Sequence, residues 1–217
     1  MKTVLHRFLS SMPRGATIML LFFVVLFPIA AAAHYFGWFN LYGLFAVERG
    51  LVLKGQVWRL LTYAFLPNGI VDWVVGLFWL ATLVGVLGRN WSGKELWTYC
   101  LLAVVTGGIF VLILPGIKFG VVGNGAMIFA LLVAWYRLYG GERLILLGVG
   151  EISVRQAAVL IAVIEVLVLV FCLGPAVTAA MMWGGVVGWL YLFLRGKNAL
   201  NRRSQQVDSE RIARLEI

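Results

Sequence analysis

The sequence offers few side chains that could carry out nucleophilic chemistry within its apolar stretches. A serine hydroxyl becomes reactive when a neighbouring base takes its proton, and the only histidines are His6 and His34. The six serines fall in polar segments between or beyond the apolar stretches: Ser10, Ser11, Ser92, Ser153, Ser204 and Ser209. The sequence therefore places no serine and histidine together at one buried site.

A thiol is a second possible nucleophile. Cys172 and His34 both lie toward the outer ends of their apolar stretches, and an imidazole there could activate the thiol. A lone cysteine in a membrane helix is more often inert packing, and His34 alone is typical of an interfacial residue. Both interpretations stay open at this point.

Glu165 is an ionisable side chain near the middle of an apolar run, VLIAVIEVLVLV. On insertion scales such a residue costs roughly 2.5 to 3.5 kcal/mol unless it is paired, hydrated or protonated. One hypothesis is therefore functional, a polar contact with a partner helix. The alternative is a protonated Glu165 that hydrogen-bonds to Asn124, Thr106 or a helix carbonyl.

The composition indicates a membrane protein with several spans. Of the 217 residues, 62% are hydrophobic and 12% are charged, which excludes an ordinary soluble domain. The net charge of +9 comes from loops and tails between apolar stretches, so it indicates membrane topology and no nucleic-acid partner. Cys100 and Cys172 lack paired spacing or a histidine cluster, so we expect no disulfide, metal site or cofactor.

Apolar length predicts six transmembrane helices, over residues 16–36, 72–87, 95–114, 125–139, 154–173 and 176–194. The first stretch could instead be a signal peptide, because small residues at 30–33 offer a cleavage pattern. We take it as a helix. Residues 37–57 mix aromatic and charged side chains, and we expect them to lie in the membrane interface rather than to cross it.

The fourth of these helices should be central. Its roughly fifteen residues would reach about 22 Å, against about 30 Å of hydrocarbon, and glycines interrupt the chain before it. Irregular backbone at membrane depth is tolerated only where protein surrounds it. The alternative is one ordinary helix of lipid length over residues 119–139, weakened by its glycines.

Six spans put both termini on one side of the membrane. Fourteen of the eighteen basic residues share that side, and the other four are Arg49, Lys54, Arg59 and Lys118. Both termini should therefore be cytoplasmic. We expect a cytoplasmic segment (residues 1–15), a membrane domain (16–194) and a cytoplasmic tail (195–217), with the protein in a plasma membrane, specifically the inner membrane of a bacterium.

Three short motifs follow one another along the chain. Trp58 and Arg59 follow the amphipathic loop, GNGA beginning at Gly123 opens the fourth helix, and MMWGGVVG in the sixth helix contains Gly184 and Gly188. In order and spacing, the chain resembles the rhomboid family of intramembrane serine proteases. The resemblance implies an all-α, six-transmembrane-helix rhomboid-like bundle with a short central helix 4 and an interfacial loop between helices 1 and 2. We expect the two glycines to pack against helix 4 residues Phe129, Ala130 and Ala134.

The chain departs from the family pattern at the positions that carry out catalysis in the family. The nucleophilic serine of Gly-x-Ser-Gly corresponds to Gly125, and the histidine base corresponds to Met181. The His and Asn that hold the oxyanion in the family correspond to Asp72 and Gly76, and a carboxylate would repel an oxyanion. A shift of one residue would put Asn124 at the serine position, and asparagine is no nucleophile either.

The resemblance therefore implies a catalytically inactive protein, a pseudoprotease, that binds transmembrane segments of partner proteins. In the family helix 5 is the lateral gate, which favours a partner contact at Glu165. One alternative is an intramembrane hydrolase whose chemistry has moved to the thiol described above. Another is a structural subunit of a larger membrane complex, which an exposed aromatic face would suit, with the candidates Trp73, Phe78, Trp79 and Trp97.

Overall fold

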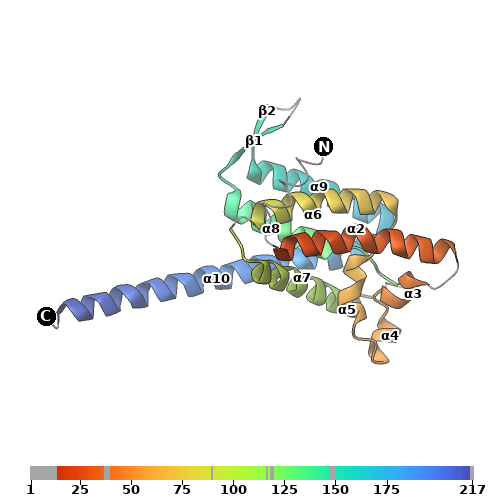
Figure 1. Ribbon diagram of the computed structural model, residues 1–217, viewed down its shortest axis with the longest axis horizontal. Coiled ribbons are helices and arrows are strands. Elements are labelled where there is room, and N and C mark those ends of the chain that lie inside the picture. The colour runs from red at the N-terminus through yellow and green to blue at the C-terminus, as the bar shows by residue number, and fades with distance from the viewer. Residues whose placement is uncertain are drawn as a thin grey trace.

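The chain folds mostly into α-helices (Figure 1). The computed structural model describes residues 14–36, 40–88, 90–115, 117, 120–146 and 150–215, and from residue 197 onward it describes the backbone alone. The long helices are α2 (Arg14–Tyr35), α6 (Ile70–Leu87), α7 (Gly93–Ile113), α8 (Gly125–Tyr139), α9 (Val154–Leu173) and α10 (Pro175–Leu215). The short elements are α3 (Leu41–Phe45), α4 (Arg49–Leu53), α5 (Arg59–Thr62), the 3-10 helix η1 (Tyr63–Phe65), β1 (Arg143–Leu146) and β2 (Gly150–Ser153).

Within the described part of the chain, five helices are long and apolar enough to cross a membrane, namely α2, α6, α7, α9 and α10. Helix α8 has 15 residues and is shorter. It is also the most enclosed helix, because α6, α7, α9 and α10 all pack around it and every side chain from Ala126 to Leu132 is buried. The prediction of a short central helix is confirmed.

The alternative of one continuous helix over residues 119–139 is wrong. Gly123 has φ of 127°, a conformation that favours glycine, and the helix begins only at Gly125. The irregular backbone before α8 is paired with protein: Gly123 N–H donates to Tyr63 O (3.0 Å), and Val121 exchanges two hydrogen bonds of 2.9 Å with Val47. These hydrogen bonds satisfy backbone amides and carbonyls that lipid could not satisfy.

Helix α10 packs closely on α8 through its glycines. A Cβ added at Gly184 would lie 2.7 Å from Ala126 Cα and closer still to Ala126 O. One at Gly188 would lie 3.1 Å from Ala130 Cα. Nearby, the Tyr99 hydroxyl donates to Ala130 O (2.6 Å). The expected contact of Gly188 with Ala130 is confirmed, whereas Gly184 contacts Ala126, one turn before the residues that we expected.

Gly184→Ala should therefore destabilise the protein by about 1 to 3 kcal/mol, because the added methyl overlaps backbone atoms that cannot move aside. Each kcal/mol lowers the melting temperature by about 2 to 4 °C in a protein of this size. The matched control is Gly185→Ala, where the new methyl meets atoms at 3.5 Å, an ordinary contact. Thermal unfolding in detergent should separate the two variants, and equal melting temperatures would contradict the packing described above.

The Trp58-Arg59 motif fastens the short helices α3 to α5 together. Arg59 is buried, and its guanidinium donates to Ala46 O, Gly43 O and Gln56 Oε1, each at 2.7 Å. The indole of Trp58 donates to Leu44 O (3.4 Å). None of these helices is long enough to cross a membrane, in agreement with the expected interfacial loop.

Buried tyrosines attach this region to the bundle. The Tyr63 hydroxyl donates to Val104 O (2.9 Å) on α7, and burial raises the pKa of Tyr63. The Tyr42 hydroxyl donates to Pro67 O (3.2 Å), and its pKa is raised by burial and by the charge of Asp72. Both phenols therefore stay protonated near neutral pH and act as donors.

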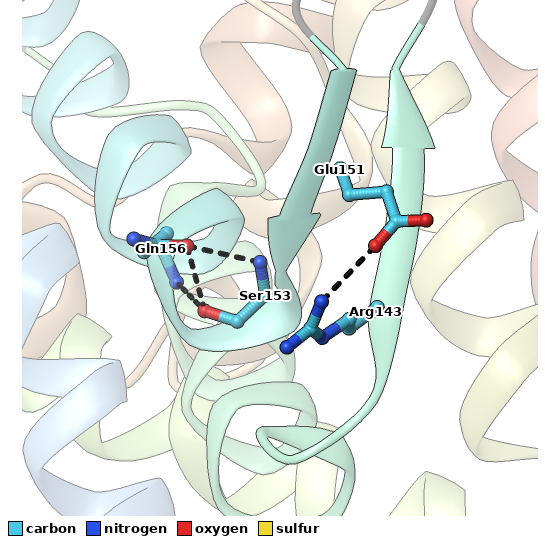
Figure 2. Close-up of polar contacts among 4 residues, drawn as sticks. All are labelled: Arg143, Glu151, Ser153 and Gln156. Atoms are coloured by element: carbon cyan, nitrogen blue, oxygen red, sulfur yellow. Dashed lines mark hydrogen bonds and ion pairs between the residues drawn. The ribbon is translucent and has the colours of Figure 1, made fainter.

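In the stretch expected to be a loop, residues 143–146 and 150–153 instead pair as the antiparallel strands β1 and β2. Figure 2 shows their ion pair, Arg143 to Glu151 at 3.1 Å, and the capping box in which Ser153 and Gln156 begin α9. Both ion-pair side chains are largely exposed, so the pair contributes little. The capping box satisfies the first free amides of α9.

Helix α10 runs to Leu215, although we expected it to end at residue 194. After Gly196 the chain lacks glycine and proline and is rich in Arg, Gln, Glu, Ala and Leu, which favour helix. Figure 1 shows the added part projecting beyond the bundle. The boundary at residues 194 and 195 is therefore a change in polarity without a break in the helix.

The two ends of the bundle differ in charge. We call the end with α3, α4, α5 and η1 the loop end, and the end with β1 and β2 the hairpin end (Figure 1). Helix α2 begins at the hairpin end, where Trp97 Nε1 donates to Gly15 O (2.9 Å). Helix α10 extends beyond the bundle at the same end, where Arg195 forms an ion pair with Glu95. Among the described side chains, the basic residues of the hairpin end are Arg14, Lys94, Arg137, Arg143, Arg155 and Arg195, whereas those of the loop end are Arg49, Lys54 and Arg59.

The four aromatic residues proposed for an exposed face do not share one surface. Trp73 Nε1 donates to Phe23 O (2.9 Å), and Trp97 bonds to the start of α2, so both attach α2 to its neighbours. Trp79 lines an internal cavity, and Phe78 alone among the four is 60% exposed. The aromatic side chains thus stabilise the bundle and leave no common docking face.

Candidate binding cavity

A cavity of about 360 Å³ lies where α6, α8, α9 and α10 meet. Helix α6 contributes Asp72 and Trp79, and the segment before α8 contributes Asn124. Helix α9 contributes residues spaced by three or four positions, which lie on one face of a helix: Ile161, Ile164, Glu165, Val168, Leu169 and Cys172. The wall is mostly apolar, with a few converging polar groups.

The cavity is open sideways, between α6 and α9. Helix α9 packs against α8 and α10, with little contact to α6, and no side chain of α9 from Val159 to Leu173 is buried. Two wall residues show the opening: Val75 on α6 is 42% exposed and Val168 on α9 is 51% exposed. In a membrane, this opening faces the lipid.

Asp72 has an identifiable structural role. Its Oδ2 accepts from the backbone N–H of Asn68 at 2.7 Å, which holds the chain just before the N-cap residue Gly69. A carboxylate in the first turn also suits the positive end of the helix dipole. The position three residues after the N-cap, from which a side chain can reach back along the chain, could have been recognised from the sequence.

Glu165 and Asn124 have no such partners. Among the described residues, neither side chain makes a hydrogen bond, although Asn124 is only 3% exposed. Thr106, a proposed partner of Glu165, donates to Leu102 O (2.7 Å) and Ala103 O (3.2 Å) on its own helix. The internal bonds that we considered for Glu165 are therefore absent from the described part of the chain.

The positions singled out by the rhomboid resemblance come together at this cavity. A Cβ added at Gly125 would lie 3.0 Å from Met181 Cβ, so these two positions face each other. A Cβ at Gly76 would lie 2.5 Å from Asn124 Nδ2, so the amide occupies the space beside Gly76. Asp72 lines the same cavity. Gly125 on α8 and Met181 on α10 are thus direct neighbours.

Of the two residues proposed for thiol chemistry, only Cys172 has a described side chain. Cys172 is exposed and lines the cavity, but the side chain of His34 lies outside the described residues. Helix α2, which carries His34, packs mainly on α6 and α7, whereas α9 packs mainly on α8 and α10. The described residues also contain no cluster of three or more metal-ligating side chains.

A family model described as "Eukaryotic integral membrane protein (DUF1751)" matches residues 14–211. The chain belongs to this family. The DUF1751 match includes every residue of the cavity, and the family is one of integral membrane proteins of unknown function in the rhomboid-like clan. No curated protein matches the chain.

Membership of the DUF1751 family agrees with a multi-pass membrane protein and corrects one expectation. The family is described as eukaryotic, so the prediction of a bacterial inner membrane is wrong. The distribution of basic residues, which we used for orientation across the membrane, carries no information about the organism.

Proposed function

We propose that this protein is a catalytically inactive rhomboid-like membrane protein that binds transmembrane segments of partner proteins in the cavity between α6 and α9. One observation carries the proposal: the cavity is open toward lipid and is lined by Glu165 and Asn124, two polar side chains without hydrogen bonds among the described residues. Polar groups inside a membrane are costly and usually mark a site of contact or transport.

Several features support catalytic inactivity. The two facing positions of α8 and α10 hold Gly125 and Met181, and neither side chain can act as a nucleophile or a base. By the rhomboid resemblance, Asp72 corresponds to a position that holds an oxyanion in the family, and its carboxylate instead accepts the backbone N–H of Asn68. Cys172 is the one thiol among the described lining residues, and none of these residues is a histidine that could activate it.

The shape of the site supports a helical occupant from the membrane. Residues 161–173 of α9 line the cavity along about 18 Å of helix, and the opening lies at the lipid-facing side. A transmembrane helix that enters between α6 and α9 could pack against this face of α9. Its polar groups would then meet Glu165 and Asn124.

Val168→Trp tests the proposal by filling the cavity mouth. The matched control is Leu167→Trp, because Leu167 is next to Val168 and equally exposed but does not line the cavity. Tagged proteins would be purified in mild detergent from cells that express the protein naturally, and copurifying membrane proteins would be quantified by mass spectrometry. We expect Val168→Trp to reduce a specific partner several-fold and Leu167→Trp to retain it.

A partner that is retained equally by both tryptophan variants would contradict binding in the cavity. Retention at a constant molar ratio would instead favour a structural subunit of a larger complex, joined through another surface. Melting temperatures of the two variants serve as a control, since both should fold like the wild type.

A further inference from the structure

The described wall of the cavity is acidic and lacks basic side chains. Asp72 and Glu165 both line it, and none of its described lining residues is Lys, Arg or His. The described basic side chains lie instead at the hairpin end or among α4 and α5. Two carboxyl groups in a poorly hydrated site attract a cation and repel anions.

Asn124 provides a second and independent observation. Its side chain is 3% exposed, lines the cavity and makes no hydrogen bond among the described residues. No fully enclosed side-chain nitrogen or oxygen lacks a hydrogen bond among the described residues, so the Asn124 amide opens into the cavity, where a polar occupant or water can reach it. An apolar occupant, such as a lipid acyl chain or a leucine-rich helix, would leave this amide unsatisfied.

The length of the groove favours a protein helix over a small cation. A second cavity of about 450 Å³ shares Asn68, Cys172 and Leu173 with the first, so the hollow continues along α9 toward the loop end. A free metal ion would fill only a small part of it. A helix packed along the opening between α6 and α9 can place apolar side chains along this length and one cationic side chain at the polar groups.

We infer that the transmembrane segment bound in this cavity carries a lysine or arginine at the depth of Glu165. This inference rests on the proposed function and specifies its ligand. An ammonium or guanidinium group has only donors. It can donate to the Glu165 carboxyl and to the amide oxygen of Asn124, and charge-assisted bonds of this kind are the stronger ones.

Cys172 supplies a native reporter for the test. It lines the same cavity and lies seven residues after Glu165 on the same face of α9, about 10 Å away along the helix. Synthetic Leu-Ala transmembrane peptides of about 23 residues would carry lysine or leucine at the centre. A single cysteine would stand seven residues before the centre in one peptide set and seven after it in the other, to cover both orientations.

The full-length protein would be reconstituted with each peptide in phosphatidylcholine vesicles, and disulfide formation with Cys172 would be measured under mild oxidation. Cys172→Ser sets the background, because Cys100 is buried. We expect the lysine peptide to cross-link about tenfold more than the leucine peptide, corresponding to one decade in Kd. Glu165→Gln and Asp72→Asn should each lower the yield of the lysine peptide.

Three results would overturn the inference, and they differ in what they say about the proposed function. Equal cross-linking of the lysine and leucine peptides would exclude the cationic preference and leave transmembrane binding intact. A lysine-peptide yield unchanged by both carboxyl variants would have the same meaning. Cross-linking of neither peptide above the Cys172→Ser background would reject the inference and the proposed function together.

Discussion

Glu165→Leu should make the purified protein more stable. The carboxyl has no hydrogen bond among the described residues and lies on a membrane-spanning helix, where its insertion costs roughly 2.5 to 3.5 kcal/mol. Leucine removes this cost and adds apolar contact. At about 2 to 4 °C per kcal/mol, the melting temperature in detergent should rise by several degrees. Binding sites commonly trade stability for function in this way.

The matched control is Ile164→Leu, the neighbouring cavity residue with an isomeric side chain, which should change the melting temperature little. A lower melting temperature for Glu165→Leu would mean that the carboxyl is held by an internal partner. That result would favour the alternative considered from the sequence, in which Glu165 is protonated and makes an internal hydrogen bond.

Arg59→Met should have the largest destabilising effect. The variant removes three hydrogen bonds of a buried guanidinium and leaves the carbonyl oxygens of Gly43 and Ala46 without their donor. Hydrogen bonds to charged groups contribute about 1.5 to 3 kcal/mol each, and non-additivity reduces the total to about 3 to 5 kcal/mol. Thermal unfolding gives the size of the effect, and hydrogen exchange of residues 41–53 shows where it acts.

Arg49→Met is the control, because Arg49 is exposed on the nearby α4 and should tolerate the change within about 0.5 kcal/mol. Arg59→Lys should recover only part of the stability, since an ammonium cannot reproduce the planar fork. If exchange of residues 41–53 were unchanged in Arg59→Met, the guanidinium would not be what fastens the short helices.

The long helices could be predicted because apolar length and glycine or proline boundaries are local signals. All of their described limits lie within two residues of the prediction except the end of α10. The pairing of β1 with β2 was missed because each strand has only four residues, too few for an alternating pattern to stand out from a loop. The extension of α10 was missed because a change to polar composition was taken as the end of a helix.

The site was predicted in part. The sequence singled out Glu165 as unusual within an apolar run, and the resemblance to the rhomboid family paired Gly125 with Met181, which face each other. The sequence could not show that Asp72 and Glu165, far apart along the chain, line one cavity, because this depends on how α6 and α9 lean against α8. Nor could it show that Asn124 lacks a partner, since that requires the positions of all neighbouring groups.

The central claim is that a partner's transmembrane segment enters between α6 and α9, and site-specific photocrosslinking in native membranes tests it most directly. Benzoylphenylalanine would replace Val168, which lines the cavity, or Leu167, which does not. We predict a defined protein adduct at position 168, none at position 167, and loss of the adduct when Glu165→Leu is added. Equal adducts at both positions, or an adduct unaffected by Glu165→Leu, would contradict the account.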